Sequence, residues 1–149
     1  MQVNNNKLFR TQKTMNCSYQ YHAKKTLIQH KYKLTQQRLS VIDVLDKNTK
    51  PLSAYQIAEE SCTAIDVATV YRTLELFEKL GFTHKIRSVD GYIKCQLQEN
   101  HHCHHYAVCT DCHDIIEMQK KHDHQHNLPK KFSTKNEVFE VTGKCNNCK

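Results

Sequence analysis

The 149-residue sequence contains no long hydrophobic run, and its first residues do not resemble a secretion signal. We therefore expect the chain to span no membrane and to lie in the reducing cytoplasm, where disulfides are rare. Its eight cysteines are then expected to be metal ligands or free thiols. The sequence also lacks the His-x-Glu and His-Glu-x-x-His motifs of zinc deaminases and metalloproteases, which argues against an enzyme.

Acidic residues are absent from positions 1 to 42, a stretch that contains eight Lys or Arg residues. Over the whole chain 22 basic residues stand against 15 acidic ones, a formal net charge of +7. A polyanion, most simply nucleic acid, is the natural partner of such a chain. A solvated basic surface on a soluble protein would have the same composition.

Two Cys-x-x-Cys pairs lie near the end of the chain, Cys109 with Cys112 and Cys145 with Cys148. Two intervening residues let the chain turn so that both thiolates of a pair point at one ion. Two pairs together supply the four sulfur ligands of a tetrahedral Zn²⁺ site. Such a site stabilises a small chain whose core is limited. Two unrelated thiol pairs, or disulfides, are the alternative.

Apolar periodicity predicts four short helices between residues 19 and 80. Ala23, Leu27 and Ile28 indicate the first. Thr35, Ser53 and Asp66 are plausible N-caps of the second, third and fourth helices. Gly81 is placed to end the fourth helix.

The fourth of these helices has the pattern of a DNA-recognition helix. It has one apolar stripe, and its polar face begins with small residues that let a helix enter a major groove, where Arg72 can reach a guanine edge. A two-residue turn at Asp90-Gly91 then predicts a hairpin over residues 82–97. Together these elements predict a winged helix-turn-helix domain at residues 19–98. A structural helical bundle with a hairpin is the alternative.

The character of the chain changes at about His101, where His and Cys become frequent. Three short segments have strand character, at residues 106–109, 115–118 and 137–142. We expect a second, metal-binding domain at residues 99–149, joined to the first near residues 97–100. Residues 1–18 are expected to form a disordered tail.

The predicted hairpin suggests a second metal site. With a two-residue turn, Ile86 pairs with Cys95, so that His84 and Cys95 are diagonal neighbours with Cβ atoms roughly 7 Å apart. An imidazole and a thiolate so placed can share an ion, with His102 and Glu117 as candidate further ligands. A Cys, two His and a carboxylate suit zinc better than ferrous iron. Alternatively, His84 is a polar strand residue and Cys95 a small buried hydrophobe.

These features together resemble the ferric uptake regulator (Fur) superfamily of metal-dependent bacterial repressors, from about residue 22 to the end. The matching words are Leu-Thr-Gln-Gln-Arg at 34–38, Ser-Ala-Tyr at 53–55, Ala-Thr-Val-Tyr-Arg-Thr-Leu at 68–74, the His-rich stretch and both Cys pairs. The resemblance implies an α+β protein, with an N-terminal winged helix-turn-helix domain followed by a small α/β dimerisation domain that carries a four-cysteine zinc site. It also implies a regulatory metal at the hinge.

Within the superfamily, the chain is most similar to the zinc-uptake regulators. The resemblance places His84, Cys95, His102 and Glu117 on the four positions of their sensing site. The iron- and peroxide-sensing branches have a carboxylate in place of Cys95 and a ligand His where this chain has Lys50-Pro51.

Three residues are candidates for DNA contact. Tyr55 and Arg72 match positions that contact DNA bases in zinc-uptake regulators, and Thr69 lies on the predicted polar face of the fourth helix. The resemblance therefore implies a zinc-responsive repressor that binds double-stranded operator DNA as a metal-loaded homodimer, with zinc in both a structural and a regulatory site. An iron- or peroxide-sensing regulator and, in a different class, a zinc buffer or metallochaperone are the alternatives.

The chain departs from the family pattern at a third metal site. Tyr106 occupies a position where the family usually has a His, and a second customary His, on the strand before the last Cys pair, is missing. Other residues are left as possible ligands there, namely His104, Cys103 and the series His122, His124 and His126. A solvated His-rich segment is the simpler interpretation of that series.

Overall fold

The computed structural model describes residues 18–96, 104–118 and 138–149 of the chain. The predictions for the N-terminal tail, for the joint between the two domains and for the series His122, His124 and His126 lie outside these residues, as do His102 and Cys103. We refer to residues 18–96 as the helical part and to the described residues from 104 onward as the sheet part.

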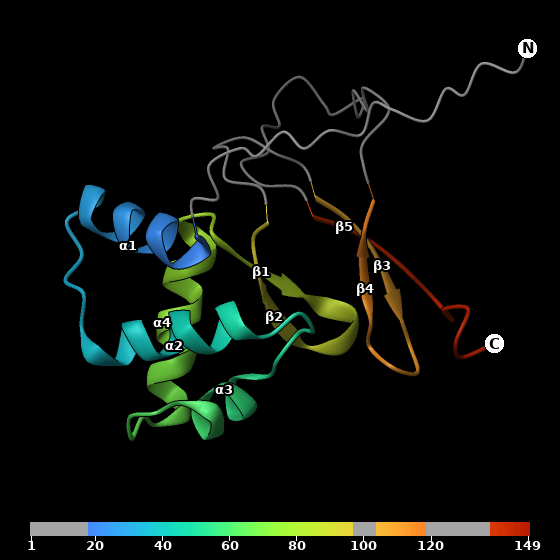
Figure 1. The fold of residues 1–149 in the computed structure, drawn as a ribbon, viewed down its shortest axis with the longest axis horizontal. Helices are drawn as coiled ribbons and strands as arrows, with labels where there is room; N and C mark the ends of the chain where they lie inside the picture. The colour runs from blue at the N-terminus through green and yellow to red at the C-terminus, as the bar shows by residue number, and fades with distance from the viewer. Residues whose placement is uncertain (1–17, 97–103, 119–137) are drawn as a thin grey trace, which may run out of the picture.

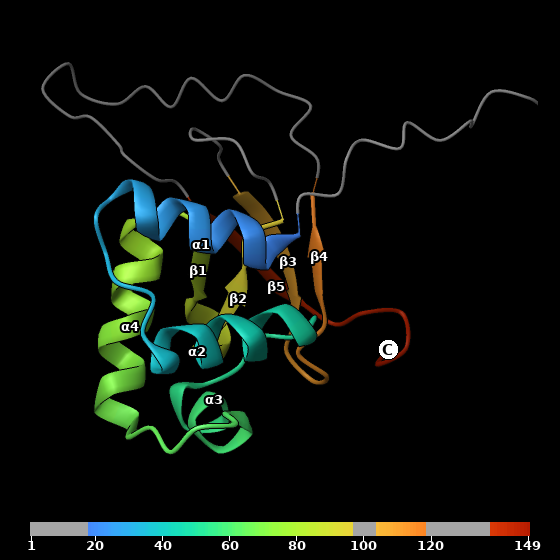
Figure 2. The same cartoon turned by 60° about the vertical axis from the view of Figure 1, so that its left-hand side comes forward.

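The helical part consists of four helices followed by a hairpin (Figure 1), as the sequence predicts. The elements are α1 (Tyr19–Gln29), α2 (Gln36–Lys47), α3 (Ala54–Glu60), α4 (Val67–Lys79), β1 (Thr83–Ile86) and β2 (Gly91–Lys94). Figures 1 and 2 show α1, α2 and α3 arranged along the length of α4. Their apolar sides form one core, whose fully buried members include Leu27, Ile42, Leu74, Phe77 and Phe82. No helix in the described part of the chain has the length and apolarity to cross a bilayer.

The predicted helix caps are confirmed. The side chain of Asp66 accepts a hydrogen bond from the backbone N–H of Thr69 at 2.9 Å, and Thr35 does the same for α2. Ser53 and Gln56 form a reciprocal capping box at the start of α3. Gly81 ends α4 with φ at +83°, a backbone conformation that residues with a side chain rarely adopt. The prediction for α1 was wrong in one detail, because Ile28 is 61% exposed.

The hairpin has a different register from the one predicted. Residues Arg87–Val89 form a short 3-10 helix, η1, and Asp90 follows with φ at +46°, so the loop is longer than two residues. As a result Ile86 pairs with Gly91 instead of Cys95, a shift of four residues, and His84 pairs with Ile93. Because four is an even number, each side chain keeps its face, and His84 and Cys95 remain diagonal neighbours.

Gly91 begins β2 at a point where the hairpin touches the connection between α2 and α3. A Cβ atom on Gly91 would lie 2.7 Å from the Cβ atom of Pro51, closer than such atoms approach in proteins. Beside it, Leu52 and Tyr92 exchange two backbone hydrogen bonds of 3.0 and 2.8 Å. This close approach holds the hairpin against the segment that leads into α3.

The sheet part contains three strands, β3 (His104–Cys109), β4 (Ile115–Glu117) and β5 (Val138–Gly143), in the order β4-β3-β5. β4 runs antiparallel to β3, and β5 runs parallel to it. Tyr106 and Val108 point from β3 towards the hairpin and pack with Ile86 and Ile93 in a second apolar core. We call this side of the sheet its inner face and the opposite side its outer face.

Candidate metal centres and nucleic-acid interface

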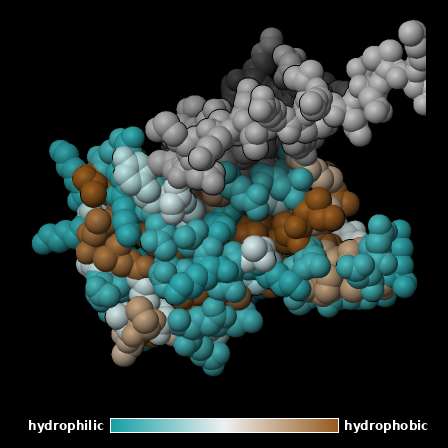
Figure 3. Space-filling model, in the orientation of Figure 1, coloured by the Kyte–Doolittle hydropathy of each residue, from teal (hydrophilic) through white to brown (hydrophobic). Residues whose placement is uncertain are grey.

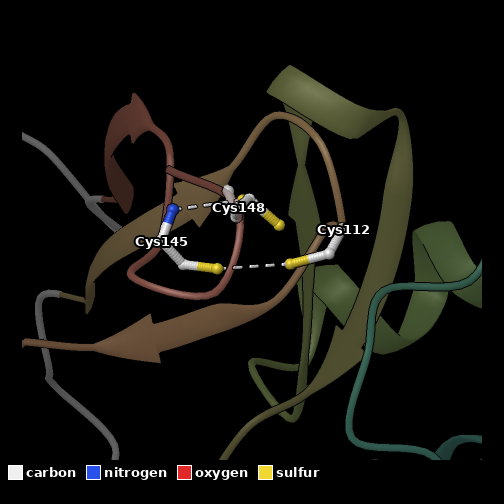
Figure 4. A group of neighbouring side chains, drawn as sticks. Cys112, Cys145 and Cys148 are labelled. Atoms are coloured by element: carbon white, nitrogen blue, oxygen red, sulfur yellow. Dashed lines mark hydrogen bonds between the residues drawn. The ribbon is translucent and has the colours of Figure 1, made fainter.

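The two Cys-x-x-Cys pairs meet at one end of the sheet. Cys109 ends β3, and it pairs with Gly143 at the end of the parallel strand β5. The turn after β3 and the turn after β5 therefore start side by side, which brings Cys112 and Cys145 together (Figure 4), with their sulfur atoms 3.7 Å apart. The four sulfur atoms all lie within 4.8 Å of one another, and no other group of candidate ligands in the described residues is so close.

The sulfur geometry fits a zinc ion. Zn–S bonds of about 2.3 Å in a tetrahedron place neighbouring sulfur atoms about 3.8 Å apart. The 3.7 Å separation between Cys112 and Cys145 agrees with that value. Four sulfur donors and no oxygen donor form the ligand set typical of a structural site. We refer to these four residues and their two turns as the zinc knuckle.

Backbone donors in the knuckle favour a thiolate at Cys109. Hydrogen bonds from the backbone N–H groups of Cys112 and Cys145 lower the pKa of the Cys109 thiol to about 6. The thiol of Cys148 has its pKa raised to about 12, first by its hydrogen bond with Cys145 and then by that with Cys112. One thiolate thus forms readily at neutral pH, whereas four adjacent thiolates need a cation to hold them together.

The second predicted metal site lies where the hairpin meets the inner face of the sheet. His84 and Cys95 are both 6% exposed and share one face of the hairpin. Glu117 pairs with Tyr106 across β3 and β4. Burial, followed by the nearby Glu117 carboxylate and Cys95 thiol, raises the pKa of Tyr106. Three of the four predicted ligands therefore border the contact between the helical and sheet parts, and His102 lies outside the described residues.

The candidate DNA-contact residues lie on the helical part. Arg72 is exposed on α4, and Tyr55 on α3 is 64% exposed. Thr69 is half-buried, and its hydroxyl donates a hydrogen bond to the Asp66 carboxylate at 2.6 Å. With its proton engaged in this way, Thr69 can contact DNA through its methyl group or as a hydrogen-bond acceptor. The roles of all three remain predictions.

A groove between the start of α2 and α4 contains a residue that the sequence reasoning did not single out. Arg38 lines this groove together with Arg72 and Thr69. The Arg38 guanidinium donates to the carbonyl of Lys33 at 2.6 Å and lies over the ring of Tyr32. It thereby fixes the α1–α2 connection and adds a second positive charge beside the exposed face of α4. The only sequence signal for Arg38 is its place in the family motif at residues 34–38.

Comparisons with known proteins agree with the resemblance found in the sequence. The family model described as the ferric uptake regulator family matches residues 29–142. The ferric uptake regulation protein of Bacillus subtilis (strain 168) is 35% identical over 135 residues, which cover 84% of this chain and 91% of that protein. The zinc uptake regulation protein of Escherichia coli (strain K12) is 30% identical over 134 residues, covering 85% and 78%.

A solved structure, described as a zinc uptake regulator complexed with zinc and DNA, shares the fold. It superposes with a TM-score of 0.75 at 28% sequence identity, and the match covers 91% of this chain and 96% of that one. Both the helical part and the sheet part fall within so broad a match. The chain therefore belongs to the ferric uptake regulator family.

Proposed function

We propose that the protein is a zinc-responsive transcriptional repressor that binds operator DNA as a homodimer. The observation that supports this most is the buried pair His84 and Cys95 at the contact between the helical and sheet parts. A thiolate in the ligand set favours zinc over ferrous iron. The relatives include both a zinc and a ferric uptake regulation protein, so an iron-responsive regulator is the second candidate.

Two zinc ions per chain would have separate roles. The knuckle would hold the first, whose binding free energy adds to the stability of the folded sheet part. The second zinc ion would be held by His84, Cys95, His102 and Glu117. Its ligands come from both parts, so the bound ion would link the helical part to the sheet part. An ion that binds one arrangement of the parts more tightly than the other shifts the population towards it. The arrangement favoured here would be the one that presents α4 to DNA.

The residues of the helical part would then read the duplex. α4 would enter the major groove with its exposed face, where Arg72 can form two hydrogen bonds with a guanine. Tyr55 would approach the same site from α3. The basic residues Lys24 and Lys25 on α1 would contact phosphates and add affinity for any sequence.

Replacing Arg72 with alanine should relax base preference at one position of each half-site. The loss of a bidentate contact is expected to cost about 1 to 3 kcal/mol against the preferred base. Binding sites selected from a random DNA pool in the presence of zinc would reveal the change. Lys25→Ala is the control, because it should weaken binding to all sequences alike. Unchanged base preference in Arg72→Ala would contradict the proposed role.

The outer face of the sheet is suited to pairing with a second copy. Ile116 on β4 and Phe139 and Val141 on β5 are 63%, 50% and 47% exposed, and all three share this face. Figure 3 shows hydrophobic surface on the β4 side of the sheet. The inner face is already covered by the hairpin. We assign the outer face to the homodimer that two DNA half-sites require.

Val141→Lys is therefore expected to shift the zinc-loaded protein from dimer to monomer, because a charge cannot be buried unpaired in such an interface. Sedimentation velocity would measure the change. Lys144→Ala, at an exposed position just beyond β5, is the control and should leave the dimer intact. A Val141→Lys protein that stays dimeric would show that another surface pairs the chains.

A further inference from the structure

Besides the apolar inner core, polar contacts join the helical part to the sheet part, among them the following two. In the first, the Glu140 carboxylate on β5 accepts hydrogen bonds from the backbone N–H groups of Arg87 and Ser88, at 2.8 and 3.0 Å. In the second, the Lys50 ammonium contacts the Asp114 carboxylate at 2.9 Å and the carbonyl of Cys112 at 3.1 Å. Neither contact involves a predicted metal-ligand side chain.

The Glu140 contact follows from the register of β5. Glu140 pairs with Tyr106, so its side chain points from the inner face towards the hairpin. There η1 begins at Arg87, and the first N–H groups of a helix have no partner within it. An ionised carboxylate is a strong acceptor for two such donors. Burial opposes ionisation, but the Arg87 and Ser88 donors outweigh it and hold the pKa of Glu140 below its usual value.

The Glu140 contact is the stronger of the two. Glu140 is half-buried, and its partners are backbone groups that cannot rotate away. The Lys50 and Asp114 side chains are 54% and 47% exposed, so water and salt screen their attraction. The hairpin that Glu140 holds also carries His84 and leads to Cys95.

The contact belongs to the arrangement that resembles a DNA-bound relative. The match to the zinc uptake regulator complexed with zinc and DNA covers 91% of this chain at a TM-score of 0.75, and it includes both parts. A different angle between the parts would lower that score. We propose that Glu140 is a positioning residue whose contact with the hairpin loop sets the zinc concentration at which the protein binds DNA. This inference rests on the proposed function.

The expected effect follows from linkage between two arrangements. A contact made only in the DNA-competent arrangement raises the ratio of that arrangement to the open one before any zinc binds the second site. While the open arrangement predominates, the zinc concentration for half-maximal DNA binding falls by the same factor. At saturating zinc nearly all molecules are DNA-competent, so the contact no longer matters there.

The experiment measures DNA binding by the full-length protein across a series of buffered free Zn²⁺ concentrations, with a duplex selected from a random pool. Glu140→Ala is expected to raise the zinc midpoint about tenfold, and Glu140→Gln, which keeps one acceptor oxygen, by about threefold. Affinity at saturating zinc should change by less than about twofold. Thr142→Ala, on the same strand and face, is the control and should match the wild type.

Zinc content, circular dichroism and dimer mass would confirm that each variant is folded. If Glu140→Ala does not fold, Glu140→Gln alone carries the test. An unchanged midpoint in the folded variants would overturn the inference. So would a loss of affinity at saturating zinc with no shift of the midpoint, which would make Glu140 a support of the DNA interface alone. If DNA binding by the wild type does not depend on the zinc concentration, the proposed function is overturned instead.

Discussion

Replacing Cys109 or Cys145 with serine is expected to abolish the dimer and to unfold much of the sheet part. Cys109 ends β3, Cys145 follows the end of β5, and the four sulfur atoms bring together the turns that follow these two strands. A serine hydroxyl is a poor zinc ligand, and the binding free energy of a structural zinc is folding free energy. We expect the loss of one zinc per chain and a stability cost on the order of 5 kcal/mol or more.

Thermal unfolding followed by circular dichroism, sedimentation velocity and zinc analysis would measure the three effects together. Cys62→Ser is the matched control, because that exposed thiol lies outside the knuckle and shares a 3.6 Å hydrogen bond with the hydroxyl of Ser40. It should keep the stability, mass and zinc content of the wild type. A zinc-free, folded dimer recovered after chelation would contradict the structural role of the knuckle.

Replacing Cys95 with serine is expected to remove the response of DNA binding to zinc while leaving the knuckle loaded. Cys95 is the only sulfur among the four predicted ligands of the second site, and its loss should weaken zinc there by about a hundredfold or more. At zinc concentrations that saturate the wild type, the variant would remain in the open arrangement and bind DNA weakly.

A DNA titration at a series of free zinc concentrations would test this, with zinc content near one per chain as the sign of an intact knuckle. Because Cys95 is buried, Cys95→Ala provides a second variant that buries no unpaired hydroxyl. Cys62→Ser again controls for the loss of a thiol. If Cys95→Ser and the wild type show the same zinc dependence, Cys95 is not a sensing ligand.

Local sequence signals predicted the helical part well. N-caps are decided by residues within one turn, and Thr35, Ser53 and Asp66 all form the expected caps. Ile28 misled the prediction because a short apolar pattern does not show which side of α1 meets the core. The stripe on α4 was clearer, and its residues Val70, Leu74 and Phe77 are buried.

The hairpin shows where local signals fail. Asp90-Gly91 has the composition of a two-residue turn, yet η1 lengthens the loop, and Glu140 from a distant strand holds that loop. A contact across 53 residues leaves no trace in the local pattern. The prediction that His84 and Cys95 share one face stayed correct only because the register shift is an even number of residues.

The knuckle was predictable and the contacts between the two parts were not. Cys-x-x-Cys spacing specifies a chelating turn by itself, so the four cysteines were identified from the sequence. Their meeting depends on the parallel pairing of β3 with β5, which the strand pattern alone did not contain. The contacts of Lys50 with Cys112 and Asp114, like those of Glu140, arise only when separate elements pack together.

The most direct test of the account is the selection of duplexes from a random DNA pool by the full-length protein with zinc, ferrous or manganous ions, or with a chelator strong enough to empty the second site. We expect an enriched two-fold-symmetric site with zinc, little enrichment with the other ions at comparable free concentrations, and none with the chelator. Enrichment by ferrous iron in preference to zinc, or equal enrichment after chelation, would contradict it.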